Sequence, residues 1–396
     1  MAAAVFLSLA TLAVSSSPAR VLVVGGSGRV GGSTARWLGK LDPTLRVAVG
    51  GRSAQSFESA RSRLPPQCEF VTVDLDGGDA ALAQAIAGYS LVVHTAGPFQ
   101  QRTDPSLMRA AIKAGIPYAD VCDELVLARN AKALTDEAAA AGVPCVVSCG
   151  IWPGVSALMA AEAVGKLGGK GACERLEFSF FTAGTGGAGP TIVSATFLLL
   201  ATKVAMYVDG DLVEEEPWLD RRVREFGEGI GEHECYTLDN PDVPTTAEAL
   251  GIKNCVSRFG TYPSFWNQLF GGLKAVLPQS LLMDRGKMQG LAIFSMPIIR
   301  AVDALVGGTN AMRVDAWSSD GRQVTLRCAH ADLEDCVGQA TAAFGLELMR
   351  GRGGGGDASA TATTVPGGVH FPAELGDAAR ANILRVAREK AIVWEM

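Results

Sequence analysis

A cluster of glycines between an apolar run and an amphipathic stretch is the first feature that points to chemistry. The chain reads VLVVGGSGRVGG over 21–32, and its glycines fit both GxGxxG from Gly26 and GxxGxxG from Gly25. Such glycines permit a tight strand-to-helix turn and let the backbone approach a phosphate. The helix N-terminus that follows offers N–H groups and a positive dipole end to a pyrophosphate. The residues predicted to hold a dinucleotide here are Gly25, Gly26, Ser27, Gly28, Arg29, Val30 and Gly31.

A cation at the end of the next predicted strand indicates which dinucleotide the turn binds. An NAD site usually has Asp or Glu at this place, on the ribose 2′-OH. Here the strand ends VGGRS, so Arg52 replaces the acid and Ser53 stands beside it. A guanidinium suits a 2′-phosphate, whereas a carboxylate would repel one. The pattern favours NADP(H), and the alternative for Arg52 is a solvated loop arginine.

Two further strand ends are expected to contact the same ligand. Asp74 and Leu75 end the third predicted strand, where the adenine would lie, and Asp74 is equally typical of a turn or a helix cap. Ligands collect at the carboxyl ends of strands in open α/β sheets. The residues that end the fourth predicted strand, beside the nicotinamide ribose, are Ala96, Gly97, Pro98 and Phe99.

The stretch YADVCDE, which follows the fourth predicted strand and its helix, carries the candidate catalytic residues. Tyr118, Asp120 and Cys122 lie near the expected nicotinamide end, where a proton donor would act. The alternative is that Asp120 and the nearby Asp123 cap or hold loops. Hydride transfer belongs to the cofactor, so the protein needs to supply only position and a proton.

The alternation of strands and helices over 20–150 predicts the scaffold that holds these residues. Apolar runs such as RVLVVGG and YSLVVHTAG alternate with helical stretches such as DPSLMRAAIKAG. This order is typical of a parallel sheet with helices on both faces. We therefore expect an α/β fold, with a Rossmann-type doubly wound parallel sheet and a second, α+β domain.

Length, composition and charge narrow the class of protein. The chain has 396 residues, 48% hydrophobic and 19% charged, which is enough for two domains with sizeable cores. The net charge is −6 and no basic block stands out, so nucleic acid is not expected as a partner. Nine cysteines without a CxxC pair favour neither a disulfide framework nor a zinc site, and no metal is predicted. These cysteines are expected to be mostly buried thiols.

Composition divides the chain into six segments. The N-terminal one is apolar, Ser-rich and free of acids, as plastid transit peptides are, which favours a plastid protein; a plain tail on a cytoplasmic protein is the alternative. The predicted segments are 1–19 (targeting segment or tail), 20–150 (NADP-binding domain), 151–330 (α+β substrate or dimerisation domain), 331–350 (helix packing back on the body), 351–369 (Gly-rich linker) and 370–396 (C-terminal helix).

A glycine-rich loop and an apolar helix stand out within 151–330. The loop GTGGAGP is either a hinge or a helix N-terminus that binds an anionic group of the substrate. The helix expected over 191–208 is short for a membrane span and carries Lys203. It is therefore expected to be buried or at an interface, with contact to a lipid surface left open. Trp152, at the crossing into this segment, either floors the substrate pocket or packs the interdomain joint.

Several motifs together resemble a known family. The stretches VLVVGGSGRVGG, VGGRS, VVHTAGPFQ, YADVCDE and GIWPGVSALMAAE resemble the saccharopine dehydrogenase-like NADP-binding oxidoreductases. TAGTGGAGPT, FGTYPSFWN and AMRVDAWSSDG are similar to the plastid members of plants and algae. The resemblance covers most of 20–350 and implies a Rossmann domain, an α+β second domain and NADP(H). Members of this family act on C–N bonds, and others are assigned to enoyl reduction.

The favoured function is that of an NADP(H)-dependent oxidoreductase that transfers hydride to or from a C–N or C=C bond of a small molecule. No tyrosine has a lysine four places on, so the Tyr-x-x-x-Lys pair of short-chain dehydrogenases is missing. A clear arginine cluster for a dicarboxylic amino acid is missing as well. The alternative function is a non-catalytic NADP-binding sensor or a scaffold at a lipid surface, and a homodimer is compatible with either.

Overall fold

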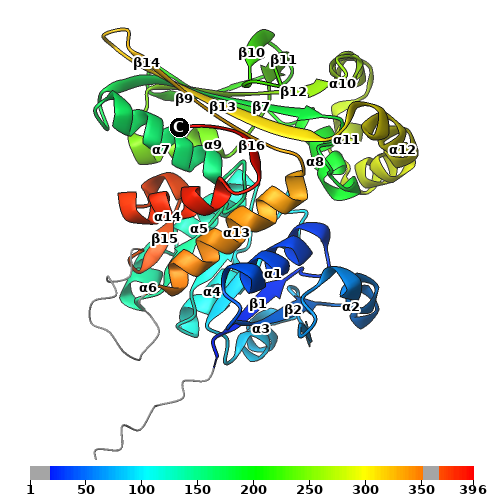
Figure 1. Ribbon diagram of the computed structural model, residues 1–396, viewed down its shortest axis with the longest axis vertical. Helices are drawn as coiled ribbons and strands as arrows, with labels where there is room; N and C mark the ends of the chain where they lie inside the picture. The colour runs from blue at the N-terminus through cyan, green and yellow to red at the C-terminus, as the bar shows by residue number, and fades with distance from the viewer. Residues whose placement is uncertain (1–17, 351–364) are drawn as a thin grey trace, which may run out of the picture.

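The computed structural model describes residues 18–350 and 365–396. The targeting segment expected over 1–19 and the linker expected over 351–369 lie mostly outside the described residues. Two β-sheets, with helices between and around them, make up the fold, and the chain crosses from one sheet to the other several times (Figure 1).

The first sheet confirms the predicted Rossmann-type scaffold. Its seven strands run in the order β15-β6-β5-β4-β1-β2-β3, and every neighbouring pair is parallel. The order reverses between β1 and β4, which is where ligands bind in such sheets. The strands are β1 (Arg20–Val24), β2 (Arg46–Gly51), β3 (Glu69–Thr72), β4 (Leu91–His94), β5 (Tyr118–Asp120), β6 (Pro144–Val146) and β15 (Gly368–His370).

Helices cover both faces of this sheet because its strands are apolar on both sides. Val21 and Val23 of β1 belong to the core that includes α1 and α13, whereas Leu22 and Val24 face α3 and α4. A strand buried on both faces reads as a continuous apolar run, which is why the sequence predicts β1 well. The helices and 3₁₀ turn are α1 (Arg29–Leu41), α2 (Ala54–Ala60), η1 (Arg61–Arg63), α3 (Gly78–Ile86), α4 (Ser106–Lys113), α5 (Leu125–Lys132), α6 (Thr135–Ala140) and α13 (Leu333–Met349).

The second sheet is mixed. Its path is β10-β11-β12-β7-β13-β14-β16, with β8 paired to β12 and β9; β7 and β12 are parallel, and the other pairs are antiparallel. The hairpin expected at Ser-Asp-Gly is the β13–β14 pair. The strands are β7 (Cys173–Ala183), β8 (Val204–Val208), β9 (Asp211–Glu215), β10 (Arg222–Glu225), β11 (Glu232–Thr237), β12 (Asn254–Tyr262), β13 (Thr309–Ser318), β14 (Gln323–His330) and β16 (Ala391–Glu395).

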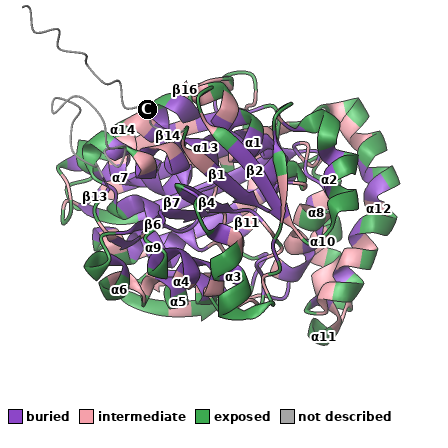
Figure 2. Cartoon of the chain, turned by 90° about the horizontal axis from the view of Figure 1, so that it is seen from below, coloured by how far each residue is buried: buried purple, intermediate pink, exposed green. Residues whose placement is uncertain are grey.

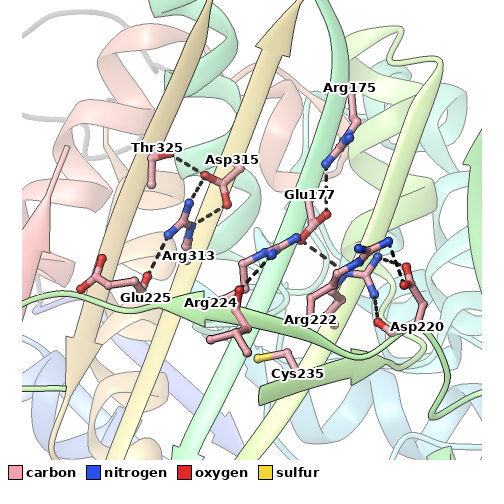
Figure 3. A network of polar contacts seen from close by, with 12 residues as sticks. Arg175, Glu177, Asp220, Arg222, Arg224, Glu225, Cys235, Arg313, Asp315 and Thr325 are labelled. Carbon is pink, nitrogen blue, oxygen red and sulfur yellow. Dashed lines mark hydrogen bonds and ion pairs between the residues drawn. The ribbon is translucent and has the colours of Figure 1, made fainter. Parts of the chain in front are cut away.

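A network of ion pairs lies on this sheet. Figure 3 shows Arg175 and Arg224 pointing to Glu177 of β7, and Arg258 of β12 reaches the same carboxylate at 3.3 Å. The Nη2 of Arg258 also lies 2.6 Å from Asp220 Oδ2. Glu177 is buried and would be costly to ionise without these partners. Arg258 therefore contacts two carboxylates, and it shares Glu177 with Arg175 and Arg224.

The remaining helices join the two sheets or flank the second one. A single hydrophobic core passes from α1 and α13 through α7 and α14 to β7 and β13. Another four helices form a group at one edge of the molecule, and α12 packs there against α8 (Figure 1). These elements are α7 (Val155–Leu167), α8 (Pro190–Leu199), α9 (Asp242–Leu250), α10 (Phe265–Val276), α11 (Gln279–Leu282), α12 (Arg285–Val306), η2 (Pro372–Glu374) and α14 (Asp377–Ala387).

Two segments differ from the helices expected there. The apolar run over 191–208 ends its helix at Leu199 and continues as β8, because Val204 and Ala205 are buried where β8 pairs with β9. The segment over 370–396 contains the short helix α14 followed by β16, which pairs with β14, and is preceded by β15 in the first sheet. The chain thus ends by tying both sheets together. The nine cysteines are all buried, as expected.

Close packing of α1 against α13 is a testable requirement of this fold. A Cβ at Gly338 would lie 2.5 Å from the Cβ of Ser33, whereas a Cβ at Gly39 would have only Pro65 Cγ, at 4.0 Å, nearby. Gly338→Ala is expected to lower the free energy of unfolding by about 1–3 kcal/mol through overpacking. The matched variant Gly39→Ala should be neutral or stabilising by up to about 1 kcal/mol, since it removes a helix glycine. Urea unfolding measures both, and equal effects would contradict the packing described here.

Candidate functional site

A cavity of about 940 Å³ lies between the carboxyl ends of the first sheet and the second half of the chain. The loops that follow β1 to β5 form one side of it. The other side comes from β7, β12 and the helical group of α8, α10 and α12. This volume is at the upper end of the range for ligand pockets, and the cavity is shared by the predicted dinucleotide turn and by residues of 151–330.

The glycine turn has the geometry that close backbone approach requires. Gly25 has a φ of +85°, and a Cβ there would lie 2.6 Å from the Cα of Ala96. A Cβ at Gly31 would lie 2.5 Å from the carbonyl oxygen of Gly25. A Cβ at Gly28 would meet only that same oxygen, at 3.1 Å, and would otherwise point into open space. Gly25 and Gly31 are therefore fixed by packing, whereas Gly28 leaves room for a ligand.

Five of the seven turn residues predicted to hold the dinucleotide line the cavity. They are Gly25, Gly28, Arg29, Val30 and Gly31, and the two that do not line it are Gly26 and Ser27. Helix α1 begins at Arg29, so the N–H groups of its first turn have no carbonyl partner within the helix. Together with the dipole of α1, these groups form an anion site at the turn.

Arg29 itself is used for structure. It forms an ion pair with Glu334 of α13, and its Nη2 donates to the carbonyl oxygen of Gly187 at 2.7 Å. Burial raises the pKa of Glu334, and its ion pair with Arg29 and the Gly189 N–H offset that effect. The Arg29 charge is therefore matched within the protein, and the backbone of the turn remains the phosphate-binding element.

Arg52 lies at the cavity, and its contact with a 2′-phosphate stays a prediction. It lines the cavity at the end of β2 and is exposed, and no ion pair or hydrogen bond of its side chain exists among the described residues. Ser53 has another role: it is the N-cap of α2, where its Oγ accepts the N–H of Ser56.

The ends of β3 and β4 line the cavity too. Asp74 both lines it and makes a turn, since its Oδ1 accepts the N–H of Asp76, so the two alternatives for this residue coexist. Arg102, in the loop after β4, reaches to within 4.0 Å of Asp76, and its buried Nε has no partner. The other predicted residues that line the cavity are Leu75, Ala96, Gly97, Pro98 and Phe99.

An acid and an amide stand together beside the expected nicotinamide end. Gln100 Nε2 donates to Asp123 Oδ2 at 2.7 Å, and both residues line the cavity. The buried Oε1 of Gln100 has no partner, so it is free to accept a hydrogen bond from a ligand. Burial raises the pKa of Asp123 to about 6. A carboxyl group with this pKa is well suited to hold or release a proton near neutral pH.

The three predicted catalytic residues lie behind this acid and do not line the cavity. Asp120 Oδ1 accepts the N–H groups of Cys122 and Ser148, so Asp120 holds the loops after β5 and β6. The hydroxyl of Tyr118 lies 2.9 Å from Nδ1 of His94 in the core. A proton-donor role for Tyr118, Asp120 or Cys122 stays a prediction, and Asp123 is the acid of this stretch that faces the cavity.

The wall opposite the strand ends is apolar. Trp152 lines it and lies against Phe180, with ring centroids 5.4 Å apart, so it both floors the cavity and packs the joint between the two halves. The apolar residues of this wall are Phe180, Ile192, Val193, Phe197, Leu199, Leu238, Phe259, Trp266, Leu269, Phe270, Leu273, Leu291 and Ile299.

The charged groups on this side are all engaged within the protein. Arg258 is held by Glu177 and Asp220, as described above. Asp303 accepts both the N–H and the hydroxyl of Thr185. Asp239 accepts the N–H of Ala205, and burial raises its pKa to about 6. In the described part of the chain, this wall therefore offers no unmatched cation to a substrate carboxylate.

The N-terminus of α8 is also occupied. Pro190 is its first residue and has no N–H, and the N–H of Gly189 donates to Glu334 Oε1 at 2.9 Å. A carboxylate of the protein thus takes the place that an anionic substrate group would need. Of the two roles considered for the loop at 184–189, this arrangement favours the structural one.

Two hydrogen bonds join the loop after β4 to the start of α12 and to Met283 just before it. Arg285 Nη2 donates to the carbonyl oxygen of Pro98 at 3.3 Å, and Gln101 Nε2 donates to the carbonyl oxygen of Met283 at 3.0 Å. These bonds hold the segment at the start of α12 against the cofactor side of the cavity.

Comparison with protein families gives a match for the first domain. Residues 21–146 match the family described as "Saccharopine dehydrogenase NADP binding domain". Three features fit NADP as the ligand: the open space beside Gly28, the unpaired guanidinium of Arg52 and the unpartnered Oε1 of Gln100. Residues 21–146 therefore form an NADP-binding domain.

Two kinds of known protein are similar to this chain, one in sequence and one in structure. "Trans-acting enoyl reductase" proteins of Mycobacterium leprae and Mycobacterium tuberculosis are 32% identical over 133 residues, or 33% of this chain. The match spans about a third of the length of these curated relatives (32%). The apo saccharopine dehydrogenase (L-Glu forming) structure from Saccharomyces cerevisiae aligns with a TM-score of 0.63 at 14% identity and covers 96% of this chain and 99% of its own. This last likeness supports the fold of both sheets together.

Arg52 is the residue whose change tests the cofactor preference. Arg52→Ala should weaken NADPH binding by about 10- to 100-fold, because it removes charge-assisted hydrogen bonds to the 2′-phosphate. NADH affinity should stay unchanged. Isothermal titration calorimetry measures both. Arg46→Ala, which removes an exposed arginine at the opposite end of β2, is the matched control and should change neither affinity. An equal loss in the two variants would contradict the assignment.

Proposed function

We propose that this protein is an NADP(H)-dependent oxidoreductase that acts on a C=C or C–N bond of an uncharged, largely apolar substrate. The observation that carries the proposal is a single cavity that runs from the glycine turn to the apolar wall of α8, α10 and α12. A substrate on that wall would lie against the nicotinamide end of a cofactor on the turn, which is the proximity that hydride transfer needs.

The chain supplies binding, closure and a proton. When bound, NADPH supplies the hydride. The first turn of α1 would bind the pyrophosphate, Arg52 would bind the 2′-phosphate, and the loop after β4 would lie beside the nicotinamide. Asp123, held by Gln100, is the group that would give a proton to the substrate during reduction and take one during oxidation.

The proposal of an uncharged substrate rests on the charges that line the cavity. An uncompensated carboxylate in an apolar cavity is strongly unfavourable. The cation on the apolar wall, Arg258, contacts two carboxylates, and Glu334 occupies the start of α8. This arrangement supports an uncharged substrate over a dicarboxylic amino acid. The enoyl reductases that are 32% identical over 133 residues support C=C reduction as the first reaction to test.

Turnover with matched acceptors tests this proposal. An unsaturated aldehyde with a long alkyl chain should oxidise NADPH, followed by the loss of NADPH absorbance. The same aldehyde with a terminal carboxylate should react at least about 100-fold less efficiently, because its charge has no partner in the cavity. Binding of NADPH without oxidation by enals or imines would favour a non-catalytic sensor instead.

The pH dependence of reduction tests the role of Asp123. With a pKa of about 6, Asp123 is mostly protonated below pH 6 and mostly ionised above it. The rate of reduction should therefore fall as pH rises through about 6, and the rate of oxidation should rise over the same range. Asp123→Asn should lower kcat by about 100-fold or more and abolish this change of the rate with pH near 6.

Asp239→Asn is the matched control for this experiment. Asp239 also lines the cavity and has a pKa raised by burial to about 6, but it is bonded to the N–H of Ala205 on the far wall. The change of the reduction rate near pH 6 should persist in this variant. If the change of rate near pH 6 disappears in Asp239→Asn and persists in Asp123→Asn, Asp239 is the proton donor instead of Asp123.

A further inference from the structure

The helical group has an apolar surface that the fold leaves uncovered. Fifteen large hydrophobic side chains are exposed in the described part of the chain, and nine of them belong to a single stretch over 262–305. We call this surface the outer face of α10–α12. Its exposed large hydrophobic residues are Tyr262, Phe265, Leu269, Val276, Met283, Ile293, Phe294, Ile298 and Leu305.

Helix α12 is apolar on two opposite sides. Its inner side contacts α8 through Met288, Ala292 and Met296 and is buried. Its outer side exposes Phe294 and Leu305 by 78% and 86%. A surface helix normally places charged residues on the side that faces water, and a helix apolar all round normally meets apolar surroundings everywhere. Figure 2 shows α12 at the rim of the molecule with its outer side uncovered.

The exposed positions of α12 follow the helical period without an acid. From Gly290 onward they form a stripe at intervals of three and four residues, flanked by the exposed cation Arg300. Such a stripe can lie flat on a planar surface along its whole length. The exposed uncharged positions are Gly290, Ile293, Phe294, Pro297, Ile298, Ala301, Ala304 and Leu305.

The charge of this region is opposite to that of the whole chain. The segment 265–306 contains four cations and two acids, within a chain of net charge −6. The acids are engaged: Asp284 accepts the N–H of Lys287, and Asp303 binds Thr185. Lys287 and Arg300 are both exposed; Lys287 also lies 3.3 Å from the carboxylate of Asp284, and Arg300 has no ion pair among the described residues. An apolar stripe with a basic rim suits a surface of anionic headgroups over hydrocarbon.

We propose that the outer face of α10–α12 docks on an anionic lipid surface, with α12 lying in the plane of the interface. In the described part of the chain, α12 is the one helix long and apolar enough to cross a membrane. Its inner side is part of the protein core, however, so it lies along the surface instead of crossing it. Contact between two copies through this face would bring like-charged rims together, which disfavours self-association.

The same helices separate the lipid surface from the cavity. Leu291 and Ile299 of α12 and Phe270 of α10 line the cavity from the inside, while their neighbours on the same helices face outward. An apolar molecule that partitions into the lipid would therefore be concentrated directly outside the cavity wall. The docking itself is independent of the proposed activity, so each can fail without the other.

Sedimentation with lipid vesicles tests the docking, with the full chain in every sample. Vesicles of phosphatidylcholine with phosphatidylglycerol should bind the protein more tightly than vesicles of phosphatidylcholine alone, and added salt should reduce this difference. The variant Phe294→Asp with Ile298→Asp should bind both at least about tenfold more weakly, since it places two charges on the docking surface. Lys287→Glu with Arg300→Glu should weaken only the binding that depends on phosphatidylglycerol.

Matched controls place the same charges elsewhere. Leu212→Asp and Ile392→Asp change large hydrophobic residues that are 43% and 55% exposed outside the helical group, and both should bind vesicles as the unaltered chain does. Unchanged NADPH affinity shows that every variant is folded. Sedimentation with neither kind of vesicle, or equal losses in the controls, would overturn the proposal. A concentration-dependent dimer that Phe294→Asp converts to a monomer would overturn it as well, in favour of a second copy.

Discussion

One buried carboxylate, Glu334, joins the starts of three helices beside the nucleotide turn. It lies in the first turn of α13, pairs with Arg29 at the start of α1, and accepts the N–H of Gly189 just before α8. Three helix N-termini, with their partial positive charges, favour a carboxylate there even though burial raises its pKa. Because α1 belongs to the first sheet and α8 to the second half, this group sets how the cofactor side of the cavity meets the substrate side.

The cofactor side could be predicted because its chemistry is local in the sequence. Gly25 and Gly31 are needed for backbone contacts within one turn, and that turn directly follows a strand apolar on both faces. Arg52 ends the next strand, and in a parallel sheet consecutive strand ends meet at one edge. Spacing alone therefore carries the information for the strands of the first sheet over 20–150 and for most residues that line the cofactor side.

The rest of the site depends on contacts between residues far apart in the chain. The sequence YADVCDE does not distinguish Asp120 from Asp123. In the structure, Asp120 is bonded to the loop after β6 and holds it, whereas Asp123 is bonded to Gln100 and faces the cavity. The segment over 370–396 is likewise divided by partners that no local pattern shows: β15 joins the first sheet beside β6, and β16 pairs with β14 of the second.

Helix α12 is another element for which the sequence pattern does not identify the buried side. Two apolar sides blur the helical period that would normally mark the buried side. Folding requires only the inner side, which packs against α8 and lines the cavity. Helix α1 of the same protein follows the usual division, since its exposed positions include the charged residues Arg36 and Lys40, whereas Leu38 is buried. The outer side of α12 is exposed in the described part of the chain, so packing in the core does not account for its apolar character.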